Sequence, residues 1–383
     1  MPARASKLTA AACLAGLLIV AAPPAPRAEP ASPNDTARFL AGLPPAPDSP
    51  LAALTAAPGW RRHARYFDAA FARQERSTIA KIRAFSATWL TNKHSTMLYM
   101  FSGPDFLYAA SFFPSASTYV LSGLEPVGRV PPLTGLSRAG LDRVLWNLRG
   151  SLSSILNVSF FITHIMAHQL RAGPVYGTLP ILYVFLARTG NTIHDISFVR
   201  LDQDGTLNAV PESAAGAEAR RGGARGVKIT FSSGDRAVQT LYYFSTDLSD
   251  YGVRRSGFLT FCGTLGAADS FIKSDSYLLH GGGFAEVRRF LLDRSATILQ
   301  DDSGIPVAYF DPTAWRLQPF GRYLGPIPIF RGVYQPRLAR LFRRGHAIPL
   351  DFGLGYRWRS NESNLLLARK IIPESNEAKL TPH

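Results

Sequence analysis

The stretch from residue 96 to residue 128 constrains the fold more than any other. Two apolar, β-prone runs, 97–101 and 118–121, flank a segment at 105–113 that is rich in Ala, Leu and aromatic residues. Ser-Gly-Pro at 102–104 breaks the chain before that segment, and a proline follows it. This order predicts a strand, a tight turn, a helix and a second strand. A connection that contains a helix favours a parallel crossover over a hairpin.

In parallel crossover units, ligands bind where the strands end at their carboxyl edge. Those ends carry Ser102, Gly103, Asp105 and Glu125, which we predict as ligand-binding residues. The glycine and the acid 22 positions after it resemble the glycine turn and the ribose-binding acid of nucleotide-binding α/β folds. Only one glycine stands where that motif needs three, so we predict no cofactor. Asp105 is equally explained as an acid in the first helical turn, after Pro104.

Glu125 has apolar neighbours, Leu124 and Pro126. This setting predicts a partly buried carboxylate, and a buried carboxylate needs a partner. Arg129 or another arginine of this basic chain is the expected partner.

The rest of the chain predicts an α/β fold with a mixed sheet. In it the crossover near the N-terminus is followed by helices and an antiparallel hairpin region, within a single large domain. Apolar periodicity predicts helices or buried segments at 60–90, 136–148, 155–170, 177–188, 257–265 and 284–292. Alternation and turn residues predict strands at 193–201, 226–231, 237–244 and 296–300, the middle two forming a hairpin.

The N-terminus has the layout of a secretory signal peptide. Arg4 and Lys7 precede an uncharged run over 8–22, and a small-residue, proline-rich segment follows. About 15 apolar residues are too few to span a bilayer, so we predict cleavage after Ala28, a periplasmic or secreted protein, and no transmembrane helix in its mature form.

Composition divides the rest of the chain. We predict a Pro/Ala-rich exposed tether at 29–58, a globular domain at 59–372 and a C-terminal tail at 373–383. Within the domain, residues 204–225 are low in apolar content and predict a flexible loop. Cys262 is the one cysteine left after cleavage and reads as a buried apolar residue.

Charge indicates a class of partner. The chain has 42 basic and 27 acidic residues, a net charge of +15. This excess suits an anionic surface or polymer of the cell envelope, and a small molecule is the other expected partner. Nucleic acid is not predicted, because no stacking platform is recognisable. We therefore expect an exported, envelope-associated protein that binds a small or anionic ligand at the carboxyl edge of the crossover.

A cofactor-independent periplasmic hydrolase is the alternative function. It would use carboxylates such as Asp301 and Asp302, or those of the crossover, together with a histidine such as His280. Residues 280–284, His-Gly-Gly-Gly-Phe, resemble the oxyanion-hole loop of esterases related to hormone-sensitive lipase. No G-x-S-x-G nucleophile motif follows it, so a helix-entry loop is the favoured interpretation.

Two further motifs have weaker support. Ser270 and Lys273 match the S-x-x-K motif of serine acyltransferases that act on peptidoglycan, but no K-T-G follows. His164 and His168 share one face of a predicted helix, yet their surroundings are apolar and lack the glutamate of H-E-x-x-H, so we predict no metal site.

Five segments together resemble an uncharacterised family of exported bacterial proteins. They are FSGPDFLYAASFFP, GLEPVG, LARTG, LQDDSGIP and LDFGLGYRW, and the resemblance covers most of residues 60–370. It implies export but no activity, so no functional residue follows from it.

Removal of the signal peptide is directly measurable. Mass spectrometry of the periplasmic or secreted fraction should find a first residue between Ala22 and Glu29. Recovery of the protein in membranes with Met1 intact would contradict this prediction.

Overall fold

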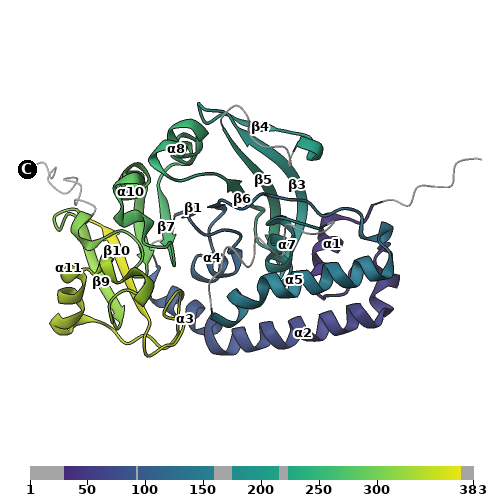
Figure 1. The fold of residues 1–383 in the computed structure, drawn as a ribbon, viewed down its shortest axis with the longest axis horizontal. Coiled ribbons are helices and arrows are strands. Elements are labelled where there is room, and N and C mark those ends of the chain that lie inside the picture. Colours follow the sequence, from purple (N-terminus) through teal and green to yellow (C-terminus); the bar gives the residue numbers. More distant parts are fainter. Residues whose placement is uncertain (1–29, 92–93, 159–174, 215–222, 372–383) are drawn as a thin grey trace, which may run out of the picture.

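The computed structural model describes residues 30–91, 94–158, 175–214 and 223–371. Ten strands form one mixed sheet in the order β4-β3-β5-β6-β2-β1-β7-β8-β10-β9, with helices on both sides (Figure 1). This arrangement confirms the predicted α/β class with a mixed sheet. The strands are β1 (Thr96–Tyr99), β2 (Thr118–Gly123), β3 (Asn191–Leu201), β4 (Leu207–Ala209), β5 (Ala224–Ser233), β6 (Gln239–Ser245), β7 (Ala268–Ile272), β8 (Ser295–Gln300), β9 (Trp315–Gly321) and β10 (Asn364–Lys370).

The helices account for most of the predicted helical segments. The longest predicted segment, 60–90, forms two helices joined by a π-helical turn, and 177–188 is a buried helix. The part of the predicted segment 155–170 beyond residue 158 lies outside the described residues. The helices are α1 (Pro33–Leu40), α2 (Pro58–Gln74), α3 (Ala80–Trp89), α4 (Phe106–Phe112), α5 (Arg138–Val158), α7 (Leu179–Arg188), α8 (Asp250–Ser256), α9 (Phe258–Thr264), α10 (Ala285–Arg294) and α11 (Pro336–Leu341).

Five neighbouring strands, β6, β2, β1, β7 and β8, run parallel and form the centre of the sheet. Strands β1 and β2 pair in parallel, and α4 connects them, which confirms the predicted crossover. The predicted hairpin is also present, because β5 and β6 pair antiparallel. Antiparallel strands therefore close both sides of a parallel centre.

The strand order reverses between β1 and β7. From β1 the chain passes through α4 to β2, and from β7 it passes through α10 to β8 on the other side. Helix α4 packs into the core on one face of the sheet, and α10 packs into the core on the other. Such a reversal opens a crevice at the carboxyl ends of the two strands, the usual ligand position in open α/β sheets.

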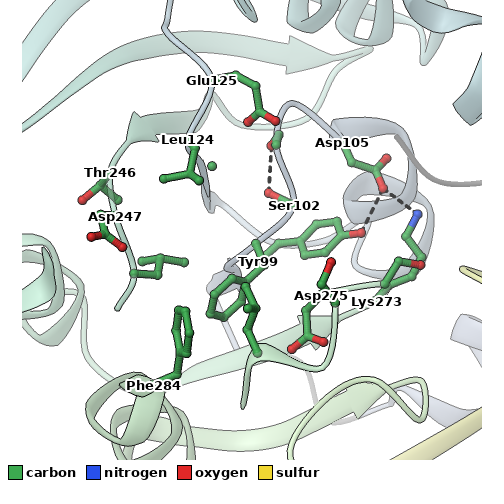
Figure 2. Close-up of a pocket in the computed structure, with 17 residues that line it drawn as sticks. Tyr99, Ser102, Asp105, Leu124, Glu125, Thr246, Asp247, Lys273, Asp275 and Phe284 are labelled. Atoms are coloured by element: carbon green, nitrogen blue, oxygen red, sulfur yellow. Dashed lines mark hydrogen bonds and ion pairs between the residues drawn. The ribbon is translucent and has the colours of Figure 1, made fainter. Parts of the chain in front are cut away.

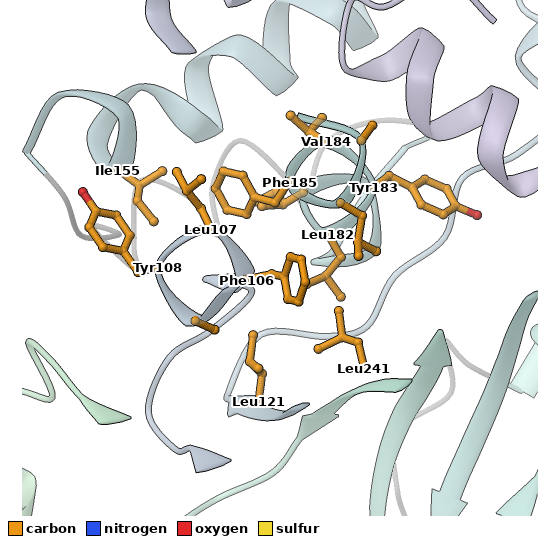
Figure 3. Packing of buried hydrophobic residues seen from close by; sticks show 14 of the residues in the cluster. Phe106, Leu107, Tyr108, Leu121, Ile155, Leu182, Tyr183, Val184, Phe185 and Leu241 are labelled. Carbon is orange, nitrogen blue, oxygen red and sulfur yellow. The ribbon is translucent and has the colours of Figure 1, made fainter. Parts of the chain in front are cut away.

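Helix α4 is buried between the sheet and further helices, because it is apolar nearly all round. Figure 3 shows Phe106 and Leu107 of α4 beside Leu182 and Phe185 of α7, above Leu121 of the sheet. All five are almost fully buried. This packing fixes α4, and with it the polar turn that joins it to β1.

The prediction of an exposed tether at 29–58 is wrong for most of that segment. Helix α1 buries Ala37, Phe39 and Leu40. The Phe39 carbonyl accepts a hydrogen bond from Trp60 Nε1 at 3.0 Å. The proline content misled the prediction, because Pro33 stands at the first helical position, where a proline favours a helix.

The prediction of a flexible loop at 204–225 is also wrong in part. Strand β4 pairs with β3 at the edge of the sheet, and β5 begins within the segment, at the buried Ala224. An edge strand is held by backbone hydrogen bonds and needs few apolar side chains, so low apolar content did not reveal it. None of the helices in the described residues is long and apolar enough to cross a bilayer.

Truncation of Phe39 tests whether the N-terminal segment belongs to the core. Its ring is fully buried, with its centre 5.6 Å from that of the Trp60 ring. Phe39→Ala should lower the free energy of unfolding by about 3–5 kcal/mol in urea denaturation followed by circular dichroism. Asp48→Ala, at an exposed position of the same segment, should change it by less than about 0.5 kcal/mol. If both substitutions change the free energy of unfolding by a similarly small amount, the segment does not belong to the core and the prediction of an exposed tether holds.

Candidate functional site

A cavity of about 240 Å³ lies at the carboxyl ends of β6, β2, β1 and β7 (Figure 2). It occupies the crevice where the strand order reverses. Ser102, Gly103, Asp105 and Glu125, the four predicted ligand-binding residues, all line it. The rest of the wall comes from further residues at the ends of β1 and β2, from residues after β6 and β7, and from the segment that leads into α10. The crossover geometry brings together residues that lie far apart in the chain.

Hydrogen bonds fix the turn after β1 beside the end of β2. The Gly103 N–H donates to the Ser122 carbonyl at 3.0 Å, and the Ser102 hydroxyl donates to the Gly103 carbonyl at 2.8 Å. Gly103 has φ +55°, which suits a residue without a side chain. Ser102 and Gly103 therefore shape the wall of the cavity through the backbone.

Asp105 and Lys273 form a buried ion pair beside the cavity. Lys273 Nζ lies 2.8 Å from Asp105 Oδ2, and each side chain is 2% exposed. The Tyr99 hydroxyl donates to the same oxygen at 2.9 Å, and burial raises the pKa of Tyr99 further from neutrality. Asp105 Oδ1 accepts the Tyr108 N–H at 3.3 Å and caps α4, so the predicted structural role of Asp105 is also present. The pair links the ends of β1 and β7.

Glu125 turns back over the end of β2, toward the cavity (Figure 2). A Cβ on Gly123 would lie 2.4 Å from Glu125 Oε2, so the glycine leaves room for the carboxylate. Glu125 is 9% exposed, and burial raises its pKa, although neighbouring donors such as the Tyr243 hydroxyl offset part of this effect. The expected pairing with Arg129 is wrong: the ion pairs found among the described residues leave Glu125 out.

Backbone strain is concentrated at this cavity. Within the described ranges, the non-glycine residues with positive φ are Phe101, Ser274, Ser276 and Tyr277. The first three line the cavity, and the fourth is adjacent in sequence. Each such residue costs on the order of 1–3 kcal/mol, and strain of this kind clusters at functional sites.

Asp301 and Asp302, two of the alternative acid/base residues, lie behind the wall and do not line it. Asp301 Oδ2 accepts the Ser274 N–H at 3.0 Å, and Asp302 Oδ2 accepts the Tyr277 hydroxyl at 2.7 Å. Burial raises the pKa of both carboxyls. Their oxygens are occupied by protein donors, and this arrangement holds the strained segment after β7.

His280, the third alternative residue, also lies outside the cavity wall. Its ring packs against Tyr277, with 5.2 Å between ring centres, and burial lowers its pKa to about 4. No histidine is among the described residues that line the cavity. The carboxylate and histidine pairing required by the hydrolase hypothesis is therefore absent from this wall.

The serine motifs give no activated nucleophile. Ser270 is fully buried in β7, and its hydroxyl bonds to that of Ser295 at 2.7 Å. Ser274 lines the cavity, but within the described chain its buried hydroxyl has no hydrogen-bond partner, so no base holds it. Among the described residues, no group of three or more His, Cys, Asp or Glu side chains could hold a metal. His164 and His168 lie outside the described residues.

A second cavity, of about 580 Å³, lies between α2, α4, the end of α7 and the start of β6. Its wall contains several arginines that already have protein partners. Arg188 Nη1 lies 2.7 Å from Asp68 Oδ1, Arg83 pairs with Glu75, and Arg236 Nη1 donates to the Pro114 carbonyl at 2.8 Å. These bonds leave little charge uncompensated, so the first cavity is the stronger candidate.

Comparison of the chain with protein-family models, with curated proteins and with solved structures found no match. Function must therefore be inferred from the chemistry of the cavity. Sequence reasoning found four residues of its wall but missed the role of Lys273, which lies about 170 residues from Asp105 in the chain. The recognisable signal was a second strand that ends in a charged residue, Lys273 after β7.

A double-mutant cycle tests the buried ion pair. Lys273→Met should lower the free energy of unfolding by about 3–5 kcal/mol, because it leaves Asp105 buried without its cation. Adding Asp105→Asn should recover a large part of that loss, since the amide keeps the shape and removes the charge. Urea denaturation measures all four variants.

The control is Arg254→Met, which breaks a more exposed pair with Glu286 and should cost less than about 1 kcal/mol. Strictly additive losses for Lys273→Met and Asp105→Asn would contradict the pairing.

Proposed function

We propose that this protein binds a small organic molecule in the cavity between the carboxyl ends of β1 and β7. The observation that carries the proposal is the position of that cavity, at the reversal of strand order and beside a buried ion pair. Small-molecule sites are concave and mostly apolar, with a few converging polar groups. This wall combines apolar side chains, such as Phe101 and Phe284, with a larger set of polar groups that includes Glu125 and the Asp105 pair.

The charges of the wall argue against an anionic ligand, although the chain as a whole is strongly basic. Four acidic residues, Asp105, Glu125, Asp247 and Asp275, and one basic residue, Lys273, line the cavity. The lysine is bound to Asp105, which leaves a surplus of acids. An anion entering this cavity would meet carboxyl groups, and the described residues of the wall include no second cation to offset them. A neutral or cationic ligand fits better.

The cavity wall contains several features that lower the stability of the fold, and their concentration there supports a binding role for the cavity. Strained backbone at Phe101, Ser274 and Ser276 lowers stability, as does the buried Glu125 carboxyl, which has no cationic partner among the described residues. Proteins commonly retain such costs at functional sites, where they limit stability in exchange for activity. All of these residues line one cavity.

The signal-like N-terminus supports an exported protein, whose ligand would then be a molecule of the cell envelope or the surrounding medium. The hydrolase alternative has less support, because it needs a histidine or an activated nucleophile in the wall. Binding therefore remains the proposed function.

A thermal-shift screen with a cavity-blocking variant tests the proposal. Polyols, amino acids, amines and carboxylic acids are added at about 10 mM, and a molecule present at a hundredfold excess over its Kd should stabilise the protein by about 2.7 kcal/mol. Leu124→Trp places a larger side chain at the cavity mouth, where Leu124 is 73% exposed. It should abolish the shifts.

Leu324→Trp is the matched control, because Leu324 is also an exposed leucine and lies outside the cavity wall. Its shifts should equal those of the wild type. Hits that survive Leu124→Trp unchanged would show that binding takes place elsewhere, and a screen without hits would count against the proposal.

A further inference from the structure

Two buried acids of the cavity wall, Glu125 and Asp275, lie outside the ion pairs of the described residues. Lys273 is neutralised by Asp105, so the pair contributes little net charge. Asp275 is 3% exposed; its Oδ1 accepts the Tyr277 N–H at 2.9 Å, and its Oδ2 has no hydrogen-bond partner among the described residues. Burial, together with the neighbouring Asp301 carboxyl, raises the pKa of Asp275 well above its ordinary value, which favours its neutral form. Asp247 is exposed at the rim and bonds to Ser249. Glu125, at 9% exposed, is the more accessible of the two acids and is therefore the one that a ligand in the cavity reaches more readily.

A buried carboxylate without a cation is unfavourable in its charged form. Glu125 is 9% exposed, and the glycine at position 123 makes the space that it occupies. A cation supplied from outside would stabilise the ionised carboxylate and provide the partner that the described residues do not. Because Glu125 is an acid that lines the cavity, the ligand group that pairs with it should be positively charged.

The remaining wall specifies the rest of the ligand. Phe101 and Phe284 meet edge to face, with 5.9 Å between ring centres, and Leu124, Leu248 and Leu278 lie beside them. These side chains offer apolar contact and aromatic surface in the same cavity as the acid. Aromatic rings and a carboxylate together recognise ammonium groups that carry an apolar body.

We infer that the ligand is a small amine whose ammonium group pairs with Glu125 and whose apolar body packs against Phe101 and Phe284. The inference rests on the proposed function and narrows its ligand class. An alcohol of the same shape would fill the same space without supplying the charge. A carboxylate of the same shape would place two like charges together.

Isothermal titration with three probes of one shape tests this inference. Benzylamine, benzyl alcohol and benzoate share a phenyl ring and differ in the charge of the attached group. Benzylamine should bind at least about tenfold more tightly than benzyl alcohol, and benzoate should not bind measurably at about 10 mM. Binding of benzylamine should be lost in Leu124→Trp.

Glu125→Gln separates the charge from the shape of the site. The amide keeps the size of the side chain, so the melting temperature should be unchanged or higher, because no ion pair of the described chain is broken. The variant should bind benzylamine at least about tenfold more weakly and benzyl alcohol as before. Asp235→Asn removes an exposed acid outside this cavity and should leave both affinities unchanged.

The outcomes distinguish this inference from the proposed function. Equal affinity for benzylamine and benzyl alcohol, or benzylamine binding that survives Glu125→Gln, would overturn the amine assignment while leaving small-molecule binding in place. Preference for benzoate would overturn it as well. A third outcome is that none of the three probes binds, while other compounds of the thermal-shift screen stabilise the wild type but not Leu124→Trp. This outcome would overturn the amine assignment and leave the cavity as the binding site.

Discussion

The ion pair between Asp105 and Lys273 is the interaction on which the arrangement of the site depends. It joins the residue that caps α4 to the residue that ends β7, across the point where the strand order reverses. Buried ion pairs are poor stabilisers compared with apolar packing, but a buried charge that loses its partner is strongly unfavourable. The pair therefore specifies one alignment of the two strand ends. The cavity lies beside that alignment, and its shape depends on it.

Stability and function are separated in space in this molecule. Apolar cores on the two faces of the sheet, such as the packing of α4 against α7, supply most of the favourable burial. The carboxyl edge of the parallel strands instead holds left-handed backbone at Phe101 and Ser274, and the buried acid Glu125, which lies outside the ion pairs of the described residues. A rigid body can support such an unfavourable edge. This division explains how a chain with one buried thiol and no disulfide among its described residues can carry a strained site.

The sequence was most informative where local rules and tertiary structure agree. Alternating breakers and apolar runs predicted the crossover, and the geometry of parallel strands then predicted that Asp105 and Glu125 share one edge. The sequence was least informative about partners distant in the chain. Lys273 had no local pattern that assigned it to Asp105, and Glu125 has no arginine partner among the ion pairs of the described residues. Helix α1 was missed because composition, and not the position of its prolines, decided the prediction.

Asp301, Asp302 and His280 show a different limit. Their residue types fit acid/base chemistry, but the structure uses both acids to hold the turn after β7 and packs the histidine against Tyr277. Residue type alone cannot separate a catalytic carboxyl from one that orders a loop, because both are buried and hydrogen-bonded. Only the direction of the side chain relative to the cavity decides between them.

A crystal structure of the protein with the tightest-binding amine tests the central claim most directly. We predict that the amine nitrogen lies within hydrogen-bond distance of Glu125 Oε1 or Oε2 and that its apolar body contacts Phe101 and Phe284. Lys273 should stay paired with Asp105. Density for the amine elsewhere on the molecule, or a cavity in which Lys273 has left Asp105 to pair with Glu125, would contradict the claim.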